Sequence, residues 1–138
     1  MILGRLLATI ILWLMRGGTG LPASGFFCVE VVQDLPERDA VREGRNQLFV
    51  DRNIFPQTLD VLLTRSEPFG IELIIDNYDE YEFTGREFGA IVQYPAADGS
   101  VRDYADFTAA AHARGVLVTA AADLLSLALL KAPGEWGA

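Results

Sequence analysis

Several residue types on which protein chemistry often depends are scarce in this chain of 138 residues. It contains one cysteine, one histidine and one lysine, which is Lys131. One cysteine cannot build a disulfide framework, and one cysteine with one histidine cannot supply the four ligands of a structural zinc ion. Any reaction that needs a lysine has a single candidate side chain.

Positive charge is scarce as well. The eleven basic residues are outnumbered by 19 acidic ones, which gives a formal net charge of −8. Nucleic acid is therefore not an expected partner, because contacts to phosphates need a basic surface. The chain also lacks a glycine-rich phosphate loop and the GxSxG turn of α/β-hydrolases, so neither nucleotide binding nor that kind of hydrolysis is predicted.

The first 44 residues differ from the rest in the distribution of charged and apolar residues. Up to Phe27 the charged residues are Arg5 and Arg16, and an apolar run follows Arg5. Residues 1–23 are similar to a secretory signal peptide, with a basic start, an apolar stretch and small residues at the end. The apolar run is shorter than the roughly 20 residues of a membrane span, so no membrane is expected as a partner. The interpretation we favour is that residues 1–44 are foreign to the domain or poorly ordered, in a cytoplasmic protein.

From Gln47 onward, apolar strands alternate with helices. Four short apolar runs predict strands, over residues 47–50, 71–75, 88–94 and 116–120. Three segments predict helices: one capped by Asn53 that ends near Gly70, one from Asp103 to Arg114, and one from Asp123 to Lys131. Strands that alternate with helices at short spacing indicate parallel βαβ units. The predicted fold class is therefore α/β, with an open sheet of doubly wound type.

Candidate functional residues each have a simpler explanation. An acidic cluster after the second strand could bind Mg²⁺ or Ca²⁺, and its members are Asp76, Asp79, Glu80 and Glu82. A solvated loop is favoured, because EF-hand spacing is missing. His112 could be a general base, but the end of a helix favours a cation-leaning residue there. Cys28 has no nearby base and is expected to be a buried apolar residue.

A tryptophan between glycines distinguishes the end of the chain. Gly134 to Gly137 follow Pro133, which ends the last predicted helix. This pattern predicts a tight loop that docks against the core or a partner, although an ordinary turn with one anchoring aromatic residue would have the same sequence. The residues alone thus lead to an α/β domain without a reaction.

Several motifs resemble the glycine cleavage system P-protein family, a family of pyridoxal-phosphate-dependent glycine decarboxylases. The motifs agree in order and spacing, and they are DRNIFPQTL at 51–59, GIEL at 70–73, FGAIVQYP at 88–95, AADLLSL at 121–127 and PGEWGA at 133–138. The resemblance covers residues 45–138 and is strongest to the amino-terminal half of the family. Residues 19–22, TGLP, also resemble the family, but the sequence after them departs from its pattern.

The resemblance implies a partial, mostly parallel sheet like the large domain of fold-type I pyridoxal-phosphate-dependent transferases. It implies a family reaction in which glycine is decarboxylated and its aminomethyl group passes to the lipoyl arm of H-protein. The amino-terminal half is the non-catalytic copy. In the catalytic half an Asp that pairs with the pyridine nitrogen matches Ala121, and the Schiff-base Lys matches a position beyond Ala138 rather than Lys131.

The sequence therefore predicts a fragment of glycine dehydrogenase (decarboxylating) that acts as a non-catalytic scaffold. Its expected partners are the remainder of the P-protein and lipoyl H-protein. No catalytic, cofactor-binding or metal-ligating residue is predicted, and no pyridoxal phosphate is expected on this chain alone. The alternative hypothesis is a secreted or membrane-tethered α/β binding module, exported by residues 1–23, with the acidic loop as a cation or partner site.

Overall fold

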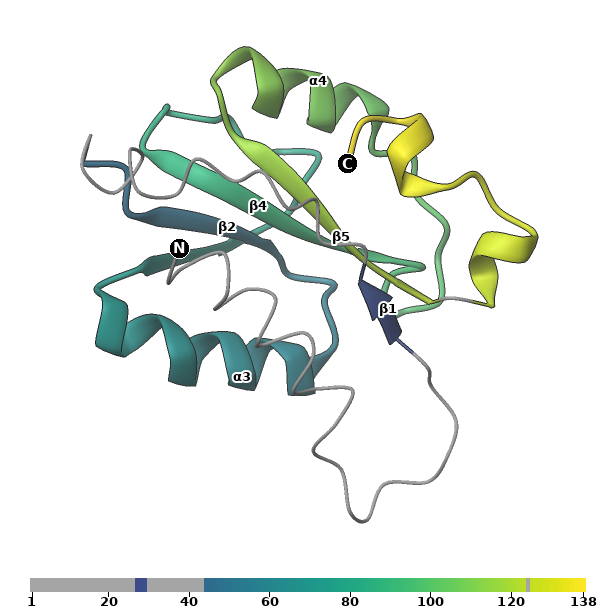
Figure 1. Cartoon of the computed structure of the whole chain (residues 1–138), viewed down its shortest axis with the longest axis horizontal. Helices are drawn as coiled ribbons and strands as arrows, with labels where there is room; N and C mark the ends of the chain where they lie inside the picture. Colours follow the sequence, from purple (N-terminus) through teal and green to yellow (C-terminus); the bar gives the residue numbers. More distant parts are fainter. Residues whose placement is uncertain (1–26, 30–43, 124) are drawn as a thin grey trace.

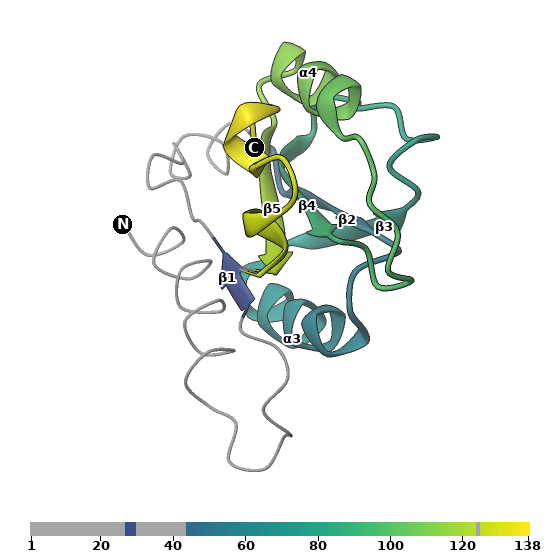
Figure 2. The same cartoon turned by 90° about the vertical axis from the view of Figure 1, so that its right-hand side faces the viewer.

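A five-stranded, mostly parallel sheet lies between two helices. The computed structural model describes residues 27–29, 44–123 and 125–138. The strands are β1 (Phe27–Val29), β2 (Gln47–Asp51), β3 (Glu72–Asp76), β4 (Glu87–Tyr94) and β5 (Leu117–Asp123), in the order β1-β5-β4-β2-β3. Helices α3 (Pro56–Ser66) and α4 (Ala105–Ala113) cover opposite faces (Figures 1 and 2). Strands β2 to β5 are mutually parallel, which confirms the predicted α/β class and doubly wound arrangement.

Strand β1 was not predicted. It pairs antiparallel with β5, so that Phe27 lies opposite Asp123 and Val29 opposite Ala121. Residues 1–23, for which a signal peptide was the alternative interpretation, lie outside the described residues. No helix in the described ranges is both long and apolar enough to cross a membrane.

The two faces of the sheet have different cores. The core under α3 is mainly aliphatic and consists of Leu48, Val50, Ile54, Leu62, Phe88 and Ile91. The core under α4 is rich in aromatic rings, among them Phe49, Phe83, Tyr94, Tyr104, Phe107 and Trp136. Since both faces are covered, the parallel strands read as continuous apolar runs rather than as alternating ones.

A proline begins helix α3, and a glycine ends the 3₁₀ turn that follows it. Pro56 occupies its first turn, where the missing N–H costs nothing. The predicted cap Asn53 is wrong: the N-cap is Phe55, and the Asn53 side chain instead donates to Asp51. After the short 3₁₀ helix Glu67–Phe69, Gly70 adopts φ +66° and its N–H bonds to the Glu67 carbonyl.

Helix α4 follows its predicted limits closely. The Asp103 carboxylate accepts the Ala105 N–H at 3.0 Å, although the helix itself begins two residues later than predicted. Gly115 adopts φ +70° and ends it.

The predicted helix from Asp123 to Lys131 is wrong. Strand β5 continues to Asp123, because its end pairs with β1. The residues before Pro133 then form a single 3₁₀ turn, Ser126–Ala128, and leave Leu125 and Leu129 exposed. A second 3₁₀ turn, Pro133–Glu135, follows.

Candidate functional site

The carboxyl ends of β2 and β4 meet at the topological switch point of the sheet. The chain leaves β2 toward α3 on one face and leaves β4 toward α4 on the other (Figure 1). Ligands of open α/β sheets bind in the crevice that such a reversal creates. Asp51 ends β2 and Tyr94 ends β4, so this is the first place to look for a site.

A buried tyrosine occupies this switch point. Tyr104 has no exposed surface, and its hydroxyl lies 3.3 Å from Asp51 Oδ2 and 3.1 Å from the Gln93 carbonyl oxygen. One hydroxyl proton can be donated to only one of these acceptors at a time. The other carboxylate oxygen of Asp51, Oδ1, accepts the backbone N–H and the side-chain amide of Asn53, both at 3.2 Å.

The electrostatics make Tyr104 a permanent donor. Burial raises the pKa of its hydroxyl well above the ordinary value of 10, and the negative charge of Asp51 raises the pKa further. The phenol therefore stays protonated at physiological pH and cannot act as a base there.

A second layer of side chains covers the tyrosine. The Tyr78 and Tyr104 rings pack edge to face with centroids 4.7 Å apart. The Arg102 guanidinium lies 5.4 Å from the centre of the Tyr78 ring and forms an ion pair of 3.1 Å with Asp98. Through Tyr104, Asp51 and Gln93, the switch point joins β2, β4 and the start of α4.

The end of β5 is the position that the resemblance matches to the cofactor partner. Ala121 is buried, with 6% of its surface exposed. The Gln93 side chain donates from Nε2 to the Ala121 carbonyl at 2.8 Å. Gln93 Oε1 is buried without a hydrogen-bond partner in the described part of the chain. The site therefore offers an amide and a methyl group where a pyridinium would need a carboxylate.

A second buried carboxylate lies at the opposite edge of the sheet, where β4 begins. Glu87 has no exposed surface. It accepts the Tyr81 hydroxyl at 2.5 Å, the Thr84 hydroxyl at 2.8 Å and the Gly85 N–H at 2.9 Å, together with the Thr84 N–H. Burial alone would raise the pKa of Glu87, but these hydrogen bonds outweigh it and lower the pKa to about 2.

The residues singled out in the sequence do not converge. Among the described residues, no three His, Cys, Asp or Glu side chains come together to hold a metal ion, which leaves the acidic cluster at 76–82 without a cation site. Asp76 accepts the N–H of Asn77 at 2.8 Å and lies 4.0 Å from Arg52. His112 is exposed in the last turn of α4. Cys28 lies in β1, and its side chain is outside the described part of the chain.

The terminal loop docks on the core. Trp136 is 8% exposed, and its ring centroid lies 5.9 Å from that of Tyr94 and 5.6 Å from that of Tyr104. This confirms the prediction of a docked loop. Lys131 is exposed in the segment between the last two 3₁₀ turns.

The sequence alone missed Asp51, Tyr104 and Glu87. Asp51 carried a usable signal, because a carboxylate that ends a buried strand lies at the ligand-binding edge of an α/β sheet. Glu87 carried another, since the preceding Thr84 and Gly85 offer nearby donors. No local pattern indicated Tyr104, whose partner Asp51 is 53 residues away.

Comparison with known proteins identifies relatives along most of the chain. The family model "Glycine cleavage system P-protein" matches residues 33–138. A glycine dehydrogenase (decarboxylating) of Bacteroides thetaiotaomicron is 52% identical over 110 residues, which are 80% of this chain and 12% of that protein. The protein of the same name from Nostoc punctiforme is 52% identical over 93 residues, which are 67% of this chain and 10% of that protein.

A solved structure agrees with these relatives. The crystal structure of glycine decarboxylase (P-protein) of the glycine cleavage system, in inhibitor-bound form, matches with a TM-score of 0.65 and 34% identity. The match covers 72% of this chain and 24% of that one. This chain thus spans only about an eighth of the length of its curated relatives, and it belongs to the glycine cleavage system P-protein family.

Proposed function

We propose that the chain is a scaffold portion of a glycine dehydrogenase (decarboxylating), and that it supplies a parallel sheet but no catalytic group. The observation that carries this proposal is the end of β5. There a buried Ala121 stands at the position matched to the acidic partner of the pyridine nitrogen, and Gln93 binds its backbone carbonyl.

The residues present do not fit pyridoxal phosphate. The cofactor is covalently held by a lysine, and a carboxylate tunes its ring nitrogen. The lone lysine, Lys131, is exposed and lies several residues past the end of β5. We therefore assign cofactor binding and decarboxylation to other parts of the complete protein.

The partners follow from this assignment. The remainder of the P-protein would pack with the sheet, and lipoyl H-protein would receive the aminomethyl group from the complete enzyme. We place the parallel part of the α/β domain at residues 45–138, to which the short strand β1 adds one edge, and we place the protein in the cytoplasm. Intact mass of the protein from its native host checks the location, because export would remove roughly the first 23 residues.

The first experiment adds pyridoxal phosphate to the purified chain and records the absorbance of an internal aldimine before and after borohydride reduction. We expect no stoichiometric band. A band that borohydride removes, and that Lys131→Arg abolishes, would overturn the scaffold assignment. A band that survives in Lys131→Arg would instead come from the terminal amine.

The second experiment tests whether the chain restores activity to a truncated relative. The Bacteroides relative is expressed without the segment that matches this chain, with or without the chain in trans, and glycine-dependent release of CO₂ is measured. We expect activity only when the chain is present, and the same activity with Lys131→Arg. Activity that needs Lys131 would contradict the proposal.

A further inference from the structure

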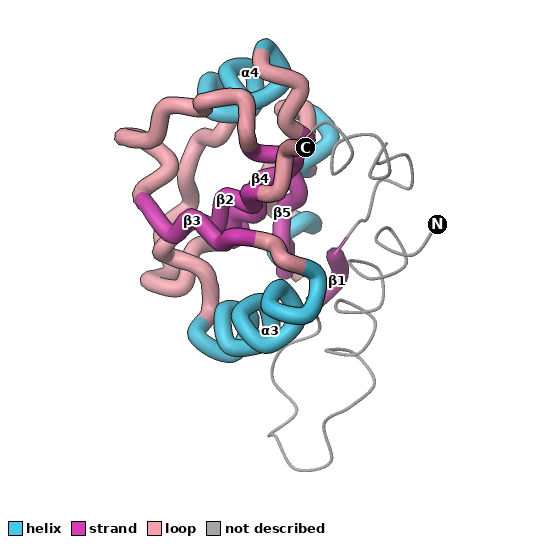
Figure 3. The backbone as a smooth tube through the Cα atoms, turned by 90° about the vertical axis from the view of Figure 1, so that its left-hand side faces the viewer, coloured by secondary structure: helices cyan, strands magenta, loops and turns pink. Residues whose placement is uncertain are grey.

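The outer edge of β3 is open. Strand β3 pairs with β2 and ends the sheet order, so within the described residues nothing pairs with its other side (Figure 3). The Glu72 N–H bonds to the Asn46 carbonyl and the Arg52 N–H bonds to the Asp76 carbonyl, both at 2.9 Å. Because ladder bonds alternate along a strand, the N–H and C=O groups of Leu73 and Ile75 point away from β2. This edge offers two donors and two acceptors to a further strand.

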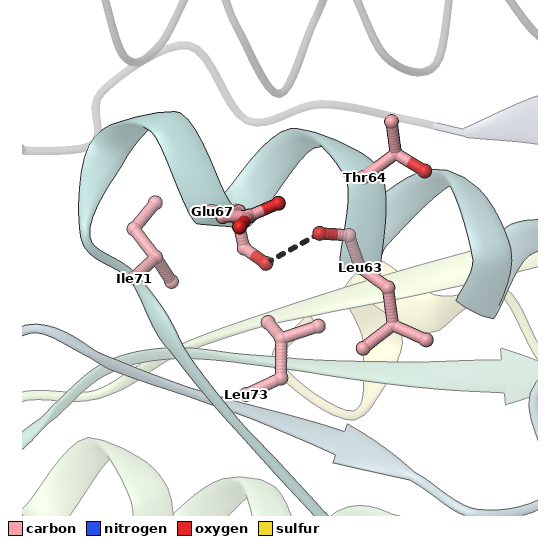
Figure 4. A pocket seen from close by; sticks show the side chains of 6 residues that line it. Leu63, Thr64, Glu67, Ile71 and Leu73 are labelled. Atoms are coloured by element: carbon pink, nitrogen blue, oxygen red, sulfur yellow. Dashed lines mark hydrogen bonds between the residues drawn. The ribbon is translucent and has the colours of Figure 1, made fainter.

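An apolar groove runs beside this edge on the α3 face. It is lined by Leu63, Thr64, Ser66, Glu67, Ile71 and Leu73 (Figure 4). Leu63, in the groove, is 47% exposed, and Ile75, on the same face of β3 as Leu73, is 42% exposed. A strand added at β3 would point every second side chain toward this groove.

The other face of the edge is acidic. Glu72 and Asp76 alternate with Leu73 and Ile75, so they lie on the α4 face of β3. Arg52 lies 4.0 Å from Asp76 with a side chain that is 55% exposed, and the neutral amide of Gln47 donates to Glu72 at 2.7 Å. On the opposite, α3 face, Glu67 adds a carboxylate at the rim of the groove.

The same charges disfavour a second copy of this chain. The antiparallel register that uses the outward groups of both Leu73 and Ile75 is centred on Ile74. It places Glu72 of each copy opposite Asp76 of the other, and like charges in direct cross-strand contact are destabilising. The occupant that fits must bring the opposite charge.

We propose that the β3 edge is a docking site for an extended polypeptide segment in which apolar and basic residues alternate. Its main chain would bond to Leu73 and Ile75, its apolar side chains would enter the groove beside Leu63, and its Lys or Arg side chains would lie against Glu72 and Asp76. This mode is strand addition, in which the main chain supplies affinity and alternate side chains supply specificity. The proposal does not depend on the scaffold function, since it concerns the outer edge of β3, which β2 and β4 separate from β5.

The test uses a fluorescein-labelled probe, acetyl-Gly-Val-Lys-Val-Lys-Val-Gly, and the full chain. Fluorescence anisotropy gives the affinity, and amide shifts in a ¹H–¹⁵N spectrum locate the contact. We expect the largest shifts at Leu73 and Ile75, and about tenfold weaker binding when alternate peptide nitrogens are methylated. Replacing Lys by Glu in the probe should abolish binding, and added salt should weaken the binding of the Lys probe.

The matched variants are Ile75→Pro and Ile75→Val. Proline removes one outward N–H and leaves the bonds to β2 intact, while valine keeps the N–H and loses one methylene. We expect about tenfold weaker binding for the proline variant and about twofold or less for the valine variant. Should the proline variant fail to fold, the methylated probe decides.

Three outcomes would overturn the proposal: no binding of the Lys probe below about 1 mM, equal affinity of the methylated probe, or concentration-dependent dimers that Ile75→Pro dissolves. The last would assign the edge to a second copy. A scaffold assignment that failed through an aldimine on Lys131 would leave all these results unchanged.

Discussion

The two fully buried carboxylates of the sheet are held in different ways. The carboxylate of Glu87, at the amino end of β4, accepts hydrogen bonds from Tyr81, Thr84 and Gly85, which lie in the loop directly before it. Asp51, at the carboxyl end of β2, is bonded by Asn53 nearby and by Tyr104, which is 53 residues away. One carboxylate closes a local loop, whereas the other joins distant elements.

The difference teaches what each edge of the sheet does. The Glu87 cluster fixes the loop 77–86, whose Tyr81 and Phe83 rings pack on Phe49 of β2 at centroid distances of 4.5 and 6.1 Å. The Asp51 cluster joins β2, β4 and the start of α4 at the switch point of the sheet. The carboxyl edge of the sheet thus holds distant elements together, whereas the amino edge holds one loop in place.

The largest expected effect comes from removing the Glu87 carboxylate. Glu87→Ala leaves the Thr84 and Gly85 amides and the Tyr81 hydroxyl without their acceptor, so we expect the free energy of unfolding to fall by about 3 kcal/mol. Chemical denaturation measures the loss. Glu82→Ala is the matched control on the exposed side of the same loop and should stay within about 0.5 kcal/mol. Equal effects of both substitutions would mean that the hydrogen bonds of the Glu87 carboxylate do not stabilise the fold.

The stabilisation by Glu87 should depend on pH. The folded-state pKa of Glu87, about 2, lies below its ordinary value of 4.5. A depressed pKa contributes stability that is fully present above the unfolded-state pKa and is lost as the pH falls through the folded-state pKa. We therefore expect the difference in unfolding free energy between the native chain and Glu87→Gln to shrink by about 2 kcal/mol from pH 6 to pH 2. Urea midpoints across this range test it, with Glu82→Gln as the control, and a constant difference would contradict it.

The sequence predicted the strands better than the contacts at their ends. Strands β2 and β4 are buried on both faces and β5 mostly so, and each reads locally as an apolar run. Strand β3 reads as an apolar run as well, although it lies at the edge of the sheet and is only partly buried. The wrong cap at Asn53 and the wrong helix after Asp123 have different causes. The Asn53 side chain bonds to Asp51, only two residues away, instead of capping the helix. Strand β5 is prolonged by pairing with the distant β1, whose Phe27 lies opposite Asp123, and no local pattern reveals that partner.

The smallest expected effect tests the long-range half of the comparison. Tyr104→Phe keeps the ring in the aromatic core but removes the hydroxyl that reaches Asp51 and the Gln93 carbonyl. We therefore expect the free energy of unfolding to fall by about 1 kcal/mol. Tyr78→Phe is the matched control, because the Tyr78 ring contacts Tyr104 but Tyr78 is less buried than Tyr104. It should change the free energy of unfolding by less than about 0.5 kcal/mol. In a double-mutant cycle with Asp51→Asn, Tyr104→Phe should show a coupling of about 0.5–1 kcal/mol. Additive effects would mean that the hydroxyl serves the Gln93 carbonyl alone, and that Asp51, like Glu87, is held by its local neighbours.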